Sequence, residues 1–433
     1  MSSTRPALRA GIAGLGTVGA GTVKMLRANA GPIADRAGRP IEVTAVSARD
    51  RSRDRGIALD GITWHEDALA LAADPNVDVV VELIGGSDGT AKALVERALA
   101  AGKPVVTANK ALLATHGAPL AAAAEAAGAT LAYEAAVAGG IPVIKALREG
   151  LAGNRVERVT GILNGTCNYI LTTMREAGRD FAEVLADAQA LGYAEADPAF
   201  DIDGVDAAHK LAILAALAFG ETVDFSAVHI EGIRRITALD IAFAQELGYR
   251  IKLLGIARRT ESGTEMRVHP AMVPAQNLLA AVEGVFNAVL LEGDFSGPVF
   301  LQGRGAGGGP TASAVVADLI DIARGTKPPV WGAGQSAIAP SRPIPIARHA
   351  GAYFIRLMVV DQPGVLADVT AILRDEGISL ESMLQHGRKP GEAVPIVLVT
   401  HDTVEAAVSA AVARIAALAA VLAPPALIRI EPN

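Results

Sequence analysis

Residues 192–210 hold the densest group of ionisable side chains in the chain, with five acidic residues around one proline and two glycines. Asp206 and Lys210 lie four residues apart in a helix predicted to begin at Gly204, so both lie on one helix face. A carboxylate that holds an amine in this way can position it for proton transfer to or from a hydroxyl group. The alternative is an ion pair on a solvated helix surface. The number of acids beside an apolar helix favours the chemical interpretation.

A second chemical signature lies near the N-terminus. Gly14, Gly16 and Gly19 follow a predicted strand and open a predicted helix, with Thr17 and Val18 between them. The first glycine permits a tight turn, the second lets a phosphate approach the backbone, and the third lets the helix pack on the strand. The N–H groups at the helix N-terminus hold a pyrophosphate. The motif therefore predicts a dinucleotide site, and a structural glycine-rich turn is the alternative.

The choice between NADP and NAD depends on the loop after the next predicted strand. That strand, residues 41–47, should end beside the adenosine ribose, where an NAD-binding protein usually places an acid. Here it leads into Arg49 and Asp50, with further arginines at 51, 53 and 55. Arg49 can pair with a 2′-phosphate, which favours NADP, although Asp50 keeps NAD possible. A solvated basic loop is the alternative interpretation.

Two further residues follow short predicted strands at the edge of the sheet where ligands bind. Lys110 comes after the strand at residues 104–107 and can reach a nicotinamide or a substrate; an ordinary surface lysine is the alternative. Glu134 comes after the strand at residues 129–133 and precedes a loop with two glycines and a proline. A carboxylate with loop carbonyls can hold a hard cation, and a structural turn is the alternative.

Residues 164–169, NGTCNY, form a polar segment between an apolar run and a predicted helix. Their hydroxyl and amide groups can bind a polar substrate, or they can form a turn that caps the helix. Cys167 is the single cysteine of the chain, which excludes an intrachain disulfide and a cysteine-rich metal site. We expect Cys167 to be a small buried residue rather than a nucleophile.

Over almost its whole length the chain resembles monofunctional homoserine dehydrogenases with a C-terminal ACT domain. The resemblance rests on residues 188–210, which match the family signature without gaps, and on three further blocks: TANK at 107–110, NGTCNYIL at 164–171 and GRGAGGGPTASAV at 303–315. It implies interconversion of L-homoserine and L-aspartate 4-semialdehyde with NADP or NAD, on the route to threonine, methionine and isoleucine.

The resemblance also implies roles for particular residues. Lys210 is expected to exchange the proton at the substrate oxygen, with Asp206 orienting it and Lys110 placing nicotinamide and substrate. Glu195 is expected to bind the substrate amino group. The other expected substrate contacts are Thr166, Tyr193 and Asp201. A sodium site is implied at Glu134 with the carbonyls of Val137, Gly139 and Ile141.

The predicted elements place these residues in an α/β protein of three parts. Strands and helices alternate over residues 8–150, which predicts a Rossmann-like, doubly wound parallel sheet. We expect a nucleotide-binding domain over residues 1–145, joined by about 303–340, since the resemblance implies that the segment from 303 returns to it. An α+β catalytic and dimerisation domain is expected over 146–302. Residues 351–433 follow a βαββαβ order, which indicates a ferredoxin-like domain.

The last domain resembles an ACT domain. Residues 361–366, DQPGVL, match its first turn, where an amino-acid effector usually meets the backbone. We expect feedback inhibition, with threonine as the first effector to test. A purely structural or dimerising domain is the alternative.

Composition excludes several other classes of protein. The chain has 433 residues, 51% hydrophobic, with a net charge of −7, which argues against nucleic-acid binding because phosphate neutralisation needs a basic face. No apolar stretch of signal-peptide length precedes the first glycines, and the longest apolar segment carries an arginine and two prolines. We therefore expect no membrane partner and a cytoplasmic location. The resemblance implies a homodimer or a homotetramer.

Two alternatives to this function stay open. One is another Rossmann dehydrogenase with a different aldehyde or 2-oxo acid substrate, which need not carry Glu195 and the segment 201–210. The other is an amino-acid sensor with a degenerate dehydrogenase part. The intact glycine motif, Lys110 and the pair of Asp206 with Lys210 argue against the sensor.

Overall fold

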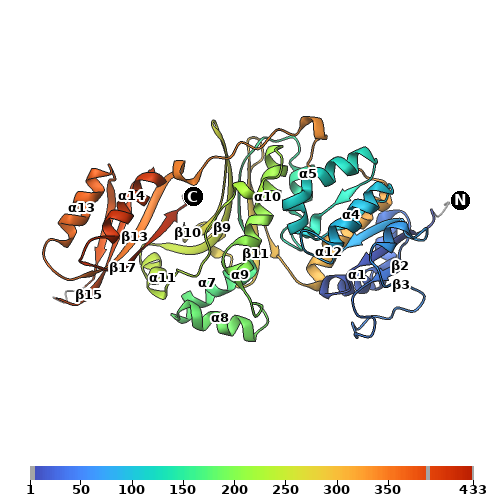
Figure 1. Cartoon of the computed structure of the whole chain (residues 1–433), viewed down its shortest axis with the longest axis horizontal. Helices are drawn as coiled ribbons and strands as arrows, with labels where there is room; N and C mark the ends of the chain where they lie inside the picture. Colours follow the sequence, from blue (N-terminus) through green and yellow to red (C-terminus); the bar gives the residue numbers. More distant parts are fainter. Residues whose placement is uncertain (1–4, 387–390, 432–433) are drawn as a thin grey trace.

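The computed structural model of the protein describes residues 5–386 and 391–431. Residues 1–4 and 432–433, at the outer ends of the first and last predicted domains, lie outside this description, as do residues 387–390. Three parts follow one another along the longest axis: a helix-covered sheet near the N-terminus, a central mixed sheet, and a C-terminal α/β part (Figure 1).

The first sheet is parallel throughout and has the strand order β3-β2-β1-β4-β5-β6. Its strands are β1 (Leu8–Ala13), β2 (Ile41–Ser47), β3 (Thr63–His65), β4 (Val79–Glu82), β5 (Val105–Thr107) and β6 (Leu131–Ala132). This is the order of a dinucleotide-binding doubly wound fold, and ligands bind where the order reverses, between β1 and β4. The predicted Rossmann-like fold is confirmed. The short edge strand β3 was not predicted.

Helices cover both faces of this sheet. One face carries α1 (Thr17–Ala28), α2 (Ala30–Ala37) and α12 (Gly308–Arg324), and the other carries α3 (Ala70–Ala73), α4 (Thr90–Ala100) and α5 (Lys110–Ala126). Helix α12 lies beside α1 although nearly 300 residues separate them (Figure 1). A β-carbon on Gly21 would lie 2.7 Å from the carbonyl oxygen of Gly308, so glycine permits this close crossing.

The central part is built around strands β7 (Val156–Ile162), β9 (Tyr249–Thr260), β10 (Gly263–Pro274), β11 (Phe286–Gly293) and β12 (Gly297–Arg304). The four predicted strands of this region lie within β9 to β12, whereas β7 was not predicted. Its helices are α7 (Gly165–Ala177), α8 (Phe181–Ala190), α9 (Ala199–Ile202), α10 (Val205–Phe219) and α11 (Ala238–Glu246). A short segment, α6 (Val143–Lys145), enters this part from the first sheet.

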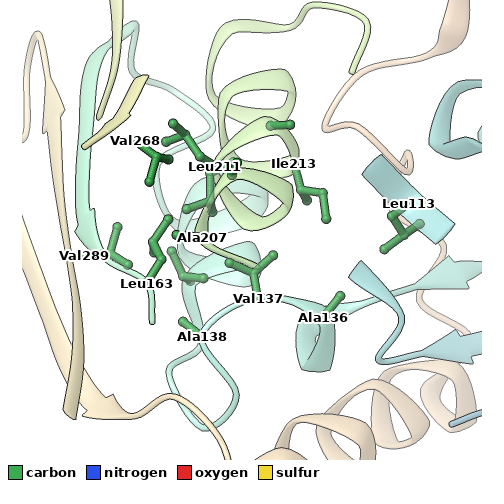
Figure 2. Close-up of a cluster of buried hydrophobic side chains, with 14 of the residues drawn as sticks. Leu113, Ala136, Val137, Ala138, Leu163, Ala207, Leu211, Ile213, Val268 and Val289 are labelled. Carbon is green, nitrogen blue, oxygen red and sulfur yellow. The ribbon is translucent and has the colours of Figure 1, made fainter. Parts of the chain in front are cut away.

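Helix α10 is the central element of the largest hydrophobic core. All its residues are buried except Val205 and Ala218. Figure 2 shows Leu211 of α10 near Val268 and Val289 of the sheet, while Leu113 of the nucleotide-binding part lies beyond Ile213. Because α10 is covered on all sides, any polar group that it carries is held in a water-poor environment.

The C-terminal part has the predicted βαββαβ order, which confirms the ferredoxin-like ACT fold. It comprises β13 (Ala350–Val360), α13 (Val365–Asp375), β14 (Leu380–Gln385), β15 (Ala393–Thr400), α14 (Glu405–Ala416) and β17 (Val421–Ile430), with a two-residue strand β16 (Thr403–Val404) before α14. Within the described ranges, no helix has both the length and the apolar composition needed to cross a membrane.

The ACT sheet is continuous with the central sheet, which the sequence did not predict. Strand β17 pairs in parallel with β10 through Ala271 with Arg429 and Met272 with Ile430. The resulting order is β12-β11-β7-β9-β10-β17-β13-β15-β14, with β8 (His229–Ile230) also on β10. The two edge strands thus pair over two residues each, which joins the two sheets. The C-terminal domain is therefore an extension of the catalytic sheet.

Buried ion pairs accompany this junction. Arg267 on β10 bonds Glu431, with 2.5 Å between Nη1 and Oε1. Arg429 on β17 lies 2.7 Å from Glu405 and 2.8 Å from Glu231 of the central part. Burial alone raises the pKa of Glu431, but Arg267, together with His269 and Arg158, lowers it to about 2. The carboxylate is therefore charged, and its loss leaves Arg267 buried without this partner.

We predict that Glu431→Gln destabilises the protein by about 3–5 kcal/mol at pH 7, the usual cost of breaking a buried ion pair. Urea unfolding of the full chain measures this change, with Glu261→Gln, in the exposed β9–β10 turn, as the matched control. Because the folded pKa is lowered from 4.5 to about 2, the stabilisation is present above pH 4.5 and is lost as pH falls toward 2. Equal unfolding midpoints for the two variants at pH 7 contradict the prediction.

Candidate active site

A cleft of about 560 Å³ lies between the nucleotide-binding sheet and the helices of the central part. Its lining includes Val18 of the glycine motif and residues of the polar segments that the sequence analysis singled out. Those segments contribute Lys110, Thr166, Tyr193, Asp201, Asp206 and Lys210, together with Gly139 of the loop after Glu134. The predicted catalytic residues and part of the predicted substrate contacts therefore line one cavity.

Asp206 lies between two lysines at the floor of this cleft. Its Oδ2 is 2.8 Å from Nζ of Lys210 and its Oδ1 is 3.1 Å from Nζ of Lys110. Burial raises the pKa of Asp206, but the ammonium groups of Lys210 and Lys110 outweigh it and lower the pKa to about 2. The carboxylate is therefore charged at neutral pH and holds both amines.

Helix α10 determines where this group lies. Gly204, with φ +87°, ends α9 and begins α10, so Asp206 stands in the first turn and Lys210 one turn later. Nζ of Lys210 also donates to the carbonyl oxygen of Leu163, at 2.7 Å. Asn164 donates to Asp206, with 2.8 Å between Nδ2 and Oδ2. The amine is thus held by two acceptors and has one N–H left for a ligand.

Lys110 is held by a hydrogen-bond network that the sequence analysis missed. Glu82, the last residue of β4, accepts from Oγ1 of Thr107 at 2.6 Å and from the N–H groups of Ile84 and Gly85. Oγ1 of Thr107 accepts from the N–H of Asn109, whose side chain caps α5. In the sequence, the signal for this network was Glu82 itself, an acid at the end of a run of valines. A carboxylate that is fully buried needs hydrogen-bond donors around it.

The substrate-side residues form a second connected group. Oγ1 of Thr166 lies 2.8 Å from the carbonyl oxygen of Tyr193 and 3.0 Å from Oδ2 of Asp201, so its single O–H is shared between these two acceptors. Asn164 connects this group to the lysines, since its Nδ2 donates to both Asp201 and Asp206. Glu195 is exposed and lies outside the cleft lining. The structure therefore brings three of the four expected substrate contacts together.

The glycine motif fits a phosphate. Gly14 has φ +97°, and a β-carbon there would lie 2.4 Å from the carbonyl oxygen of Leu83. A β-carbon on Gly19 would lie 2.0 Å from the carbonyl oxygen of Gly14. At Gly16 a β-carbon meets no atom within 4 Å, so the backbone is open at the N-terminus of α1, beside Thr17. These features are what an approaching pyrophosphate requires.

Arg49 lies exposed just beyond β2. Arg55, six residues further along the loop, contacts the glycine motif. Its Nε donates to the carbonyl oxygen of Leu15 at 3.1 Å, and its guanidinium carbon lies 5.7 Å from the centre of the Trp64 ring. The loop after β2 is therefore anchored to the turn that receives the dinucleotide.

Glu134 is buried beneath the loop that leads to Ile141. Its two oxygens accept from the N–H groups of Ile144 and Lys145, each at 2.9 Å. Burial and the nearby Asp318 raise the pKa of Glu134 to about 7. In the described residues no three His, Cys, Asp or Glu side chains form a metal cluster. A cation here would depend on backbone carbonyls, and Ala138 and Gly139, with φ of +55° and +49°, give the loop the curvature for that.

Cys167 is fully buried, and its Sγ lies 3.2 Å from the carbonyl oxygen of Asp201. Burial, together with Asp201, raises the pKa of the Cys167 thiol well above its usual range. The thiol is therefore a packing group and no nucleophile.

Comparison with known proteins agrees with this geometry. Residues 14–134 match the profile "Homoserine dehydrogenase, NAD binding domain", residues 142–320 match "Homoserine dehydrogenase" and residues 353–420 match "ACT domain". The homoserine dehydrogenase of Pseudomonas aeruginosa is 49% identical over 431 residues, covering 98% of this chain and 99% of its own. That of Neisseria gonorrhoeae is 47% identical over 427 residues, covering 97% and 98%.

Solved structures agree as well. A homoserine dehydrogenase from Thiobacillus denitrificans has a TM-score of 0.93 at 49% identity, covering 99% of both chains. A hyperthermophilic archaeal homoserine dehydrogenase in complex with NADPH has a TM-score of 0.62 at 26% identity, covering 73% of this chain and 97% of its own. With its open glycine turn facing a carboxylate held between two lysines, and with relatives of nearly equal length, this chain belongs to the homoserine dehydrogenases: nicotinamide-dependent oxidoreductases, here with a C-terminal ACT domain.

Proposed function

We propose that the protein interconverts L-homoserine and L-aspartate 4-semialdehyde, with Lys210 as the group that exchanges the hydroxyl proton. The observation that carries this proposal is the contact of Lys210 with Asp206, which also holds Lys110, in the cleft that the glycine motif enters. The nicotinamide, when bound, takes up or returns the hydride. In reduction, the Lys210 ammonium group gives a proton to the aldehyde oxygen as the hydride reaches the carbon, which leaves alcohol and neutral amine. In oxidation the reverse step starts from the neutral amine, which takes the hydroxyl proton while the hydride leaves.

The other residues bind and orient the substrate in this proposal. Asp206 keeps Lys210 directed at the substrate oxygen, and Lys110 positions the substrate against the ring. The side chains proposed to contact the amino-acid end are Glu195, Thr166, Tyr193 and Asp201. Glu195 lies two residues after Tyr193, which lines the cleft, and this proximity supports its contact with the substrate ammonium group.

We predict that Lys210→Ala lowers turnover of NADPH with aspartate 4-semialdehyde by at least about 10²-fold, the usual contribution of a general acid–base group. NADPH binding, followed by its fluorescence, should change little because the glycine motif lies elsewhere in the cleft. Lys327→Ala, an exposed lysine, is the matched control. Near-normal turnover of Lys210→Ala removes this residue from the mechanism, and absence of turnover in the unaltered enzyme removes the substrate assignment.

We propose a preference for NADP over NAD, supported by Arg49 at the end of β2 and by the anchoring of its loop at Leu15. Arg49→Ser should raise the KM for NADPH about tenfold and leave the KM for NADH unchanged, because it removes a partner of the 2′-phosphate alone. Arg53→Ser makes the same change of charge in the same loop and serves as the control. An equal effect on both coenzymes contradicts the assignment.

We propose that a sodium ion binds at Glu134 with the carbonyls of Val137, Gly139 and Ile141. The curved backbone at Gly139 and the buried carboxylate support an oxygen-lined site for a monovalent cation. The N–H bonds to Glu134 occupy one lone pair on each oxygen and leave others for a cation.

We propose that the ACT domain binds an amino-acid effector, with threonine as the first candidate. A cavity of about 300 Å³ lies at residues 361–366, where Gly364, with φ +98°, begins helix α13. The helix N-terminus suits the effector carboxylate. Gln385 of β14 also lines this cavity.

We predict that L-threonine raises the melting temperature of the enzyme and inhibits it, since a ligand of the folded state stabilises it. Gln385→Trp should abolish both responses by filling the cavity, while Glu381→Trp, on β14 outside the cavity lining, should retain them. Inhibition that survives Gln385→Trp places the effector elsewhere.

We further propose that the chain forms a homodimer or homotetramer. Exposed apolar side chains on the central part support this assembly: Leu278, Phe286 and Phe295, which is 92% exposed.

We propose the domain division into residues 1–145 with about 303–340, 146–302 and 351–433, supported by the packing of α12 on α1. A cytoplasmic location is proposed on the single, buried cysteine.

A further inference from the structure

Asn287 is a buried amide in the cleft, and the described part of the chain supplies no hydrogen-bond partner for it. The side chain is 1% exposed, it lines the cleft, and within the described residues neither Oδ1 nor Nδ2 has a hydrogen-bond partner. Buried polar groups are nearly always paired, so an amide with both ends unpaired at a ligand cavity points to a partner supplied by the ligand.

The other buried asparagines in the described part of the chain show how unusual this is. Asn109 caps α5 and donates to Gly86, and Asn164 caps α7 and donates to two carboxylates. The two N–H groups of the Asn168 amide are shared among the carbonyl oxygens of Val282, Gly284 and Phe286, which lie 2.9–3.2 Å from Nδ2, and Oδ1 accepts from Lys252. The fold therefore satisfies each of the other three amides at both ends.

Two glycines lie against the amide of Asn287. A β-carbon on Gly305 would lie 2.1 Å from its Cγ, and one on Gly165 would lie 3.5 Å from its Oδ1. Asn287 stands on β11 two residues before Val289, which packs toward α10 (Figure 2), so its side chain points to the same face of the sheet. Two glycines thus flank the amide where the polar segment at 165 meets the glycine cluster at 305.

The location favours the nicotinamide end of the coenzyme. The glycine cluster that contacts Asn287 continues to Gly308, where a β-carbon would lie 3.0 Å from the carbonyl oxygen of Thr17 in the dinucleotide motif. The same cleft is lined by Val18 of the dinucleotide motif and by Lys210. Asn287 therefore shares one cleft with the dinucleotide motif and the reacting groups.

The chemistry of the amide selects the group that it would bind. Oδ1 needs a donor and the adjacent Nδ2 needs an acceptor, and a primary carboxamide offers both on neighbouring atoms. The nicotinamide ring carries such a carboxamide, whereas the amino-acid end of the substrate carries full charges, for which Asp201 already lines the cleft. We propose that Asn287 binds the carboxamide of the nicotinamide and so fixes which face of the ring meets Lys210 and the substrate.

The test compares coenzymes that differ only in this group, and it rests on the nicotinamide dependence of the enzyme. Calorimetric titration gives the Kd of the oxidised coenzyme and of its 3-acetylpyridine analogue, which keeps the carbonyl and lacks the N–H donors. The unaltered enzyme should bind the natural coenzyme about tenfold more tightly, the value of one hydrogen bond. Asn287→Ala should bring this ratio close to one.

Three controls make the outcome decisive. The coenzyme fragment without nicotinamide, 2′-phospho-ADP-ribose, should bind equally to both proteins, which shows that the variant is folded. If the alanine variant does not fold, Asn287→Ser, which keeps one small polar group, replaces it in the same titration. Gln302→Ala, on the exposed face of the neighbouring strand β12, should retain the ratio of the unaltered enzyme.

Each other outcome overturns the proposal in a distinguishable way. An unchanged coenzyme ratio with a raised KM for homoserine assigns Asn287 to the substrate. Weaker binding of 2′-phospho-ADP-ribose assigns it to the structure of the glycine cluster. If the unaltered enzyme binds neither coenzyme, the dehydrogenase activity itself fails, independently of Asn287.

Discussion

The buried carboxylate of Asp206 is the constraint on which the rest of the site depends. It has to be charged to hold Lys110 and Lys210. Burial opposes that charge, and the two lysines outweigh burial and keep the carboxylate ionised. Lys110 comes from the nucleotide-binding part and Lys210 from the central part. One ionic group therefore ties the element that receives the coenzyme to the element that receives the proton.

Helix α10 makes this arrangement rigid. It is buried on nearly every side, so its first turn cannot adjust to solvent and its two charged residues keep fixed positions. The buried Glu82 does the same for Lys110 through Thr107 and the cap of α5. Preorganised partners of this kind need little rearrangement when the substrate binds, which is what a proton transfer at a set distance requires.

The regulatory part reaches this site through hydrogen-bonded strands. Strand β17 continues the sheet that carries β10, and α10 packs on β10. The ion pairs of Arg429 and Arg267 hold the junction, and Arg356 of the ACT sheet bonds the buried Asp240 at the start of α11. The ACT domain is therefore joined to the central part by paired strands and buried ion pairs.

The sequence by itself determined the local elements and most of the chemistry. Apolar runs alternating with helical stretches predicted the Rossmann strands, and the same kind of pattern predicted the helix from Gly204 and the βαββαβ order of the last domain. The i, i+4 spacing placed Asp206 beside Lys210. Contacts between residues that lie far apart in the chain were decided only by the tertiary structure. Lys110 and Asp206 meet because α5 and α10 pack together, 96 residues apart in the chain.

Three further features belong to the tertiary structure alone. The joined sheet arises because two edge strands pair, and edge pairing leaves no periodic signal in either strand. The orphaned amide of Asn287 is visible only once its neighbours are known, since an isolated asparagine in a strand is unremarkable in sequence. The buried role of Glu82 depends on Thr107 from the next strand. The local sequence determines which polar groups each element carries, and long-range packing determines which of these groups come into contact. The physical reason is that a polar group can be buried only where packing supplies a hydrogen-bond or ionic partner.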